Sequence, residues 1–314
     1  MLSTVLNERN SDKMFKKIAI AIATLVLIAY CVISYNLAKS ITMPKTLTLD
    51  EERKWIEENN LLGSFDTYEK QDYKIEGYNG YTINAQLVKS KDNNSNKYVI
   101  VSHGFRSNRN GSIKYIDTYQ KLGYNVIIYD VRGHGLNEKT AVSLGNIESE
   151  DLYMIIQDTY KRFGENIHLG LHGESMGSSI SLSVLSKKPK LDFVVADCGF
   201  SNLYNLIYGA YKENNIGFLI YGVSAATKLG YHIDMKKTSP IDALSQNNIP
   251  ICFIHGENDT FIKPKHSELM FENNKSIDEL HIVPKAEHAS SISVLGTDKY
   301  SEIISEFFKS TQKS

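Results

Sequence analysis

The chain has 314 residues, of which 42% are hydrophobic and 23% charged, a globular composition that excludes disordered, collagen-like and disulfide-scaffold proteins. Thirty-five basic and 36 acidic residues leave a net charge of -1, which gives no electrostatic reason to expect nucleic acid as a partner. The length suffices for one large domain with an appendage, or for two small domains. The three cysteines follow no metal-ligand spacing, so we predict free thiols and no metal site.

An uncharged apolar run, residues 18–35 (IAIAIATLVLIAYCVISY), lies near the N-terminus. As a helix it spans about 27 Å, which is enough for the hydrocarbon core of a bilayer. Four basic residues precede it: Arg9, Lys13, Lys16 and Lys17. The positive-inside rule then keeps residues 1–17 in the cytoplasm. We predict an uncleaved, single-pass signal anchor in the cell membrane, with the catalytic domain outside the cytoplasm. A cleaved signal peptide is the alternative, and Met14 is a second plausible start.

Behind the anchor, residues 36–64 are predicted to form a tether that leads to one folded domain at residues 65–314. This domain begins with two strand-like stretches, residues 73–78 and 81–89. Between them, Asn79-Gly80 suits a two-residue hairpin turn, because both central residues of such a turn need positive φ.

Six short apolar runs then alternate with helical stretches along the chain. They are residues 97–102, 126–129, 167–171, 193–196, 251–254 and 280–283. Continuous apolar strands separated by helices indicate a parallel sheet with helices on both faces, and the chemistry of such sheets lies at the carboxyl ends of the strands. One long interruption, about residues 202–237, is predicted to form a small helical cap. A second membrane helix is the alternative, but Lys212, Glu213 and Lys228 leave too short an uncharged stretch for it.

The motif G-x-S-x-G occurs at residues 173–177 (GESMG), between a predicted strand and a predicted helix at residues 178–186. In that context the motif places a serine on a strained strand-to-helix turn, with its hydroxyl above the sheet at the positive end of the helix. We predict that Ser175 is a catalytic nucleophile. The alternative is a glycine turn with a structural role alone.

A serine nucleophile needs a base, and in such a sheet its partners follow it in the order Ser, Asp, His. Nine histidines are available. His288 lies in a loop behind the last strand, from which its imidazole can reach back over the sheet, so we predict that it is the base. His103 is predicted to shape the backbone of its turn, and His255 is predicted to pack at the end of a strand.

For the acid we predict Asp259, which follows the strand at residues 251–254. Its carboxylate would accept a hydrogen bond from the Nδ1–H group of His288 and stabilise the imidazolium that forms during the reaction. Asp197 and Glu257 are the alternatives. Each of these carboxylates can also be interpreted as a structural group that caps a loop.

Two backbone N–H groups are predicted to hold the oxyanion. One belongs to Met176, the residue after the nucleophile, and the other to Phe105, in the loop after an early strand. The sequence contains no H-E-x-x-H, C-x-x-C, P-loop or G-x-G-x-x-G fingerprint, so we predict no metal and no cofactor.

Together these residues resemble the α/β-hydrolase superfamily, and within it the bacterial branch of serine-aminopeptidase-like proteins. The matching segments are HGF (103–105), YDVRGHG (129–135), GLHGESMG (170–177), ADCGFSN (196–202), SPIDAL (239–244), PICFIHGENDTFI (250–262) and AEH (286–288). The resemblance covers about residues 66–312. It implies an α/β fold with an eight-stranded, mostly parallel sheet, a cap after strand six and a triad of Ser175, Asp259 and His288.

The leading hypothesis is therefore a membrane-anchored serine hydrolase that cleaves carboxylic esters of small acyl substrates through an acyl-enzyme. An ester is favoured because its leaving group departs easily, and the apolar cap favours acyl or aromatic groups. A serine peptidase or amidase is the alternative, since the same triad serves it. A catalytically silent, membrane-tethered interaction module is the alternative from another class.

Overall fold

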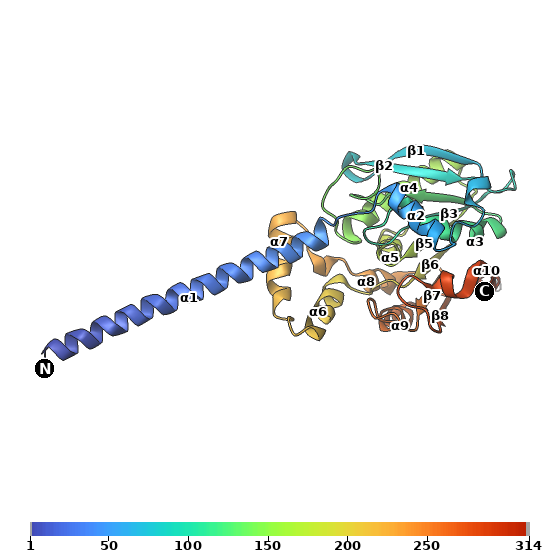
Figure 1. Cartoon of the computed structure of the whole chain (residues 1–314). Coiled ribbons are helices and arrows are strands. Elements are labelled where there is room, and N and C mark those ends of the chain that lie inside the picture. The colour runs from blue at the N-terminus through green and yellow to red at the C-terminus, as the bar shows by residue number, and fades with distance from the viewer. Residues whose placement is uncertain (1, 312–314) are drawn as a thin grey trace.

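The computed structural model describes residues 2–311 and shows a long N-terminal helix that projects from a domain built on one sheet (Figure 1). Eight strands form the sheet in the order β1-β2-β4-β3-β5-β6-β7-β8. Their bounds are β1 Lys70–Glu76, β2 Thr82–Val88, β3 Lys97–Ser102, β4 Asn125–Tyr129, β5 His168–Glu174, β6 Phe193–Asp197, β7 Ile251–Gly256 and β8 Asp278–Val283. β2 pairs antiparallel with β1 and β4, and the other pairings are parallel. The predicted fold class is thereby confirmed.

The connection between β1 and β2 differs from the predicted two-residue hairpin. The ladder ends at the pair Glu76 and Thr82, so five residues join the two strands. Asn79 and Gly80 do have positive φ, 56° and 73°. The longer loop is stabilised by a residue that is far away in the sequence, because the Asp151 carboxylate accepts a hydrogen bond of 2.8 Å from the N–H of Tyr78. Such a tertiary contact leaves no mark in the local sequence.

Alternate residues of the central strands face two separate cores. One face of the sheet is covered by α4 (Asn146–Phe163), α5 (Met176–Ser183), α8 (Pro240–Ala243) and α9 (Lys265–Asn273). The other is covered by α2 (Leu49–Glu58), α3 (Ile116–Lys121) and α10 (Ser291–Thr311). On β3, Ile100 faces the first core, whereas Val99 and Val101 face the second. All three are fully buried, as a parallel sheet with two covered faces requires.

The predicted cap consists of two helices between β6 and β7, α6 (Leu203–Glu213) and α7 (Leu219–Tyr231). Neither helix is long enough to span a bilayer, which agrees with the rejection of a second membrane helix. α7 packs against α1 (Leu2–Thr42) and runs across it where α1 meets the domain (Figure 1).

α1 is one continuous helix that contains the predicted anchor and extends beyond it to Thr42. Over Asp12–Thr42 it is long and apolar enough to cross a membrane, a property that it shares with signal sequences.

The segment predicted as a tether, residues 36–64, is not a free linker in the structure. It includes the end of α1 and the whole of α2, which begins with a capping box between Thr48 and Glu51. Ile56 of α2 is fully buried in the second core. The segment is therefore part of the folded domain, because one side of α2 is buried against it.

Candidate active site

Ser175 lies on the turn between β5 and α5, with φ 55° and ψ -117°. A non-glycine residue with such a backbone carries strain on the order of 1–3 kcal/mol. The flanking glycines make the turn possible. A Cβ on Gly173 would lie 2.2 Å from the carbonyl oxygen of Gly177, and a Cβ on Gly177 would lie 2.0 Å from that of Ser102. Both glycines of the motif are therefore required by close backbone packing around Ser175.

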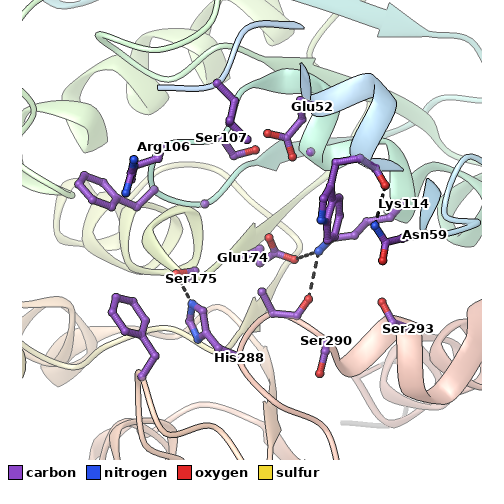
Figure 2. Close-up of a pocket in the computed structure, with 17 residues that line it drawn as sticks. Glu52, Asn59, Arg106, Ser107, Lys114, Glu174, Ser175, His288, Ser290 and Ser293 are labelled. Atoms are coloured by element: carbon purple, nitrogen blue, oxygen red, sulfur yellow. Dashed lines mark hydrogen bonds and ion pairs between the residues drawn. The ribbon is translucent and has the colours of Figure 1, made fainter. Parts of the chain in front are cut away.

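Two hydrogen bonds connect Ser175 through His288 to Asp259. The Ser175 Oγ lies 2.9 Å from the His288 Nε2 (Figure 2), and the His288 Nδ1 lies 2.7 Å from the Asp259 Oδ2. The Asp259 side chain is fully buried, whereas that of His288 is 24% exposed. The structure thus brings together the three residues predicted as the triad, from the loops that follow β5, β7 and β8.

The surroundings of Asp259 keep its carboxyl group ionised. Its Oδ1 accepts hydrogen bonds of 2.9 and 2.8 Å from the N–H groups of Phe261 and Ile262. Burial raises the pKa of Asp259, but hydrogen bonds from His255 and His288 lower it more, and the pKa lies well below its ordinary value. An ionised Asp259 accepts a hydrogen bond from the Nδ1–H group of His288, which leaves the Nε2 atom free to take a proton from the nucleophile.

The two alternative acids lie in other contacts. Asp197 accepts hydrogen bonds from the hydroxyls of Ser291 and Tyr300, at 3.2 and 2.9 Å. Glu257 accepts one of 3.3 Å from a backbone N–H in the loop after β8. Within residues 2–311, neither carboxylate is hydrogen-bonded to His288, so the geometry favours the predicted acid.

The loop after β3 approaches the nucleophile. A Cβ on Gly104 would lie 3.6 Å from the Ser175 Cβ, and Phe105 lines the pocket beside Ser175. Met176 is the first residue of α5, and the first N–H groups of a helix have no carbonyl partner within it. Both residues predicted as oxyanion donors therefore lie next to Ser175, and their role stays a prediction.

Two buried histidines join that loop to the loop after β4. The His103 Nε2 accepts a hydrogen bond of 2.9 Å from the N–H of Val131, and its Nδ1 donates to the Gly104 carbonyl at 2.8 Å. The His134 Nε2 accepts from the N–H of Arg106 at 3.2 Å. Burial lowers the pKa of His103 to about 3 and that of His134 to about 4, so both are neutral at pH 7. His103 thus shapes the backbone of its turn, as predicted.

A pocket of about 560 Å³ opens beside Ser175 and His288 (Figure 2). Among the described residues that line it, none belongs to the predicted cap at 202–237, so the expectation that the cap selects acyl groups finds no support here. Glu52 and Trp55 of α2 line it instead. Sequence reasoning missed both residues because it interpreted their segment as a tether outside the folded domain. Trp55 is the only tryptophan of the chain, and this was the one sign in the sequence that could have drawn attention to it.

Glu52 contributes a buried carboxylate to this pocket. Glu52 is 5% exposed as a residue. The Oε2 atom of its carboxylate has no hydrogen-bond partner among the described residues. Burial raises the pKa of Glu52 above its ordinary value. A substrate group that donates a hydrogen bond would satisfy this oxygen.

A buried ion pair between Lys114 and Glu174 forms part of the same wall (Figure 2). The two side chains are 3% and 11% exposed, and the Lys114 Nζ also donates to the Ala289 carbonyl at 3.1 Å. Burial lowers the pKa of Lys114, but the Glu174 carboxylate raises it more, so the lysine is charged. Sequence reasoning missed both residues. Glu174 occupies the second position of G-x-S-x-G, which the motif leaves open.

Removal of the Lys114 charge is expected to destabilise the fold. In Lys114→Met, Glu174 becomes a buried charge without a cationic partner, a loss of about 3–5 kcal/mol in the free energy of unfolding. Urea unfolding of the full chain in detergent measures it. Lys121→Met is the matched control, because the ion pair of Lys121 with Asp298 is exposed and is worth no more than about 1 kcal/mol.

A second variant separates the lost ion pair from lost packing. Lys114→Met combined with Glu174→Gln removes both charges of this ion pair, so it is expected to regain most of the lost stability. Equal stability losses in Lys114→Met and Lys121→Met would contradict the role of this ion pair.

One group of side chains has the composition of a metal site. Single ligand atoms of Cys198, Asp259 and His288 lie within 4.8 Å of one another. Burial raises the pKa of the Cys198 thiol well above its ordinary value, whereas a cysteine binds metal as a thiolate. Asp259 and His288 are already hydrogen-bonded to each other. These observations do not favour a metal at this site, and its absence stays a prediction.

Sequence comparison finds similar proteins over most of the chain. A family model described as "Serine aminopeptidase, S33" matches residues 93–200, which include Ser175 but neither Asp259 nor His288. The protein YqkD of Bacillus subtilis is 28% identical over 306 residues, 95% of this chain and 99% of its own length. Lipase 3 of a Moraxella species is 24% identical over 76% of this chain and 84% of its own length.

Solved structures show the same fold. The esterase Pf2001 of Pyrococcus furiosus matches with a TM-score of 0.63 and 24% identity, covering 78% of this chain and 93% of its own. An acylaminoacyl peptidase of Pyrococcus horikoshii matches with a TM-score of 0.60 and 15% identity, covering 77% of this chain and 41% of its own. Together with the sequence comparison, these similarities confirm the resemblance inferred from the motifs.

Proposed function

We propose that this chain, an α/β hydrolase by fold and by sequence similarity, is a membrane-anchored serine hydrolase that cleaves carboxylic esters. The observation that carries the proposal is the hydrogen-bonded series of Ser175, His288 and Asp259 beside a pocket of about 560 Å³. The fold alone hosts many activities, so the proposal rests on the geometry of the site.

In the proposed reaction, the Ser175 Oγ attacks the acyl carbon while the His288 Nε2 takes the hydroxyl proton. The imidazolium, stabilised by Asp259, then gives this proton to the leaving alkoxide as the ester C–O bond breaks. Water, deprotonated by the same Nε2, then attacks the acyl carbon of the acyl-enzyme. The imidazolium returns this proton to the Ser175 Oγ as the bond between that oxygen and the acyl carbon breaks, which releases the carboxylic acid and restores the serine. The N–H groups of Phe105 and Met176 hold the oxyanion, and the loss of such a donor costs about 2.7–4 kcal/mol in known cases.

Ester cleavage is supported by the leaving-group chemistry and by the printed names of two similar proteins, Lipase 3 and the esterase Pf2001. The peptidase or amidase alternative is supported by the description of the matching family model and by the acylaminoacyl peptidase structure. The same three side chains serve either reaction, because both pass through an acyl-enzyme and differ in the leaving atom.

A matched pair of substrates separates the two reactions. We expect the full chain in detergent to hydrolyse a short-chain p-nitrophenyl ester and to leave the p-nitroanilide of the same acyl group without measurable turnover. Because the acyl group is shared, the difference reports the leaving group alone. A peptidase also cleaves the activated ester faster than the anilide, so measurable turnover of the anilide, even when slower than that of the ester, would favour the peptidase alternative. Turnover of neither substrate, with no labelling by a fluorophosphonate, would favour the interaction module.

The anchor has its own test. Protein isolated from the membrane fraction is expected to retain residues 18–35, as measured by mass spectrometry of the intact chain. A mature chain that begins after residue 35 would show that α1 acts as a cleaved signal sequence instead.

A further inference from the structure

The N-terminal helix is docked onto the cap helix α7. The Tyr30 hydroxyl donates to the Phe218 carbonyl at 3.1 Å and accepts from the N–H of Gly222 at 2.9 Å. The rings of Tyr35 and Tyr231 stack with their centroids 6.2 Å apart. Because α1 is continuous through this region, these contacts fix the direction of the projecting helix relative to the domain.

These contacts begin inside the apolar run of α1. The run ends at Tyr35, and Tyr30 lies five residues earlier, about 7.5 Å farther from the domain along the helix. Ser34, which is 2% exposed, lies against Gly222, where a Cβ would come within 2.2 Å of the Ser34 Oγ. When α1 crosses a bilayer, α7 therefore lies at the level where interfacial helices bury an apolar face about 5–10 Å deep. Figure 1 shows α7 running across α1, as a helix in the membrane plane would.

The side of α7 that faces away from the folded domain is apolar. Phe218, which caps the helix, and Tyr221 and Leu229 within it are 59%, 71% and 81% exposed, and Ala225 is exposed between them. Their spacing of three, four and four residues places them on one side of the helix. A surface helix in water carries polar residues on that side. The single charged residue of α7, Lys228, lies near its C-terminal end and pairs with Asp234 at 2.9 Å.

We propose that α7 is an interfacial membrane helix, with the stripe of Phe218, Tyr221, Ala225 and Leu229 in contact with the lipids of the outer leaflet. The proposal rests on the membrane anchoring in the proposed function. Lipid is the occupant because the stripe lies beside the exposed apolar surface of α1, which the bilayer covers in any case. The cap then contacts the membrane rather than the substrate. This agrees with the lining of the pocket, which includes no cap residue among those that the structure describes.

Tryptophan fluorescence in vesicles tests this placement. The full chain, with its only tryptophan removed by Trp55→Phe, is reconstituted in phosphatidylcholine that carries bromine either near the headgroup or near the chain end. Three variants each add one reporter. Tyr221→Trp probes the stripe, Ile28→Trp probes the middle of the apolar run, and Val294→Trp probes an exposed apolar position on α10, at the other end of the molecule (Figure 1).

The expected result is a loss of Tyr221→Trp emission that is greater with bromine near the headgroup than near the chain end. Ile28→Trp is expected to lose emission mainly to deep bromine, and Val294→Trp to lose none. Quenching at position 28 without quenching at position 221 overturns the proposal and leaves the anchor intact; a second copy seated on the stripe would give this pattern. Absence of quenching at both positions overturns the anchor and the proposal together.

Discussion

The Ser175→Ala variant is expected to lower kcat for the preferred ester by about a million-fold, the loss known when the serine of such a triad is removed. Without the hydroxyl no acyl-enzyme forms, and His288 has no proton to take. Alanine keeps the Cβ, so the strained backbone of the turn stays as it is, and we expect a change in the free energy of unfolding of no more than about 1.5 kcal/mol. Steady-state kinetics and urea unfolding of the same preparation measure both quantities.

Ser186→Ala is the matched control for this variant. Ser186 is exposed and its hydroxyl donates to the Ser183 carbonyl, outside the pocket. The control is expected to keep the activity of the unaltered chain. A Ser175→Ala variant that is folded and still active would exclude every reaction in which Ser175 is the nucleophile.

The Asp259→Asn variant is expected to lower kcat by about 10,000-fold, the loss known for the equivalent change in a serine triad. The amide has nearly the same shape, but it carries no charge to stabilise the imidazolium. It also offers an N–H, which favours the tautomer of His288 whose Nε2 is protonated and unable to accept the Ser175 proton. The loss is therefore expected in kcat, with KM little changed.

Asp298→Asn is the control for this change, because the Asp298 side chain is 87% exposed and pairs with Lys121 on the surface. It is expected to leave kcat unchanged. Activity in Asp259→Asn close to that of the control would show that His288 works without this acid, and Asp197 would return as an alternative.

The placement of the triad residues could be predicted because the strands of a parallel sheet are short continuous apolar runs that stand out in a sequence. Their carboxyl ends meet at one edge, so residues as distant as Ser175 and His288 can be assigned to one place from the order of the strands. The strain at Ser175 was also foreseeable, since two glycines flank it at the spacing that the turn requires.

The wall of the pocket could not be predicted in the same way. Lys114 and Glu174 are sixty positions apart, and charged residues in a sequence are ordinarily expected at the surface. Only the folded structure shows that the two side chains form a buried ion pair. Glu52 and Trp55 were missed because a short charged helix gives no local sign of the surface that it covers. Glu52 and Ile56 are both buried and lie four residues apart, so they share one side of α2, but a glutamate at that spacing is ordinarily expected to face solvent.

Reaction of the full chain in detergent with a fluorophosphonate, followed by peptide mapping with mass spectrometry, tests most directly whether Ser175 is an activated nucleophile. A single adduct on Ser175 is expected, with none in Ser175→Ala, because only a serine paired with a base reacts with this reagent at a useful rate. A folded chain that acquires no adduct, or one that is modified elsewhere while Ser175 stays free, would contradict the proposed function.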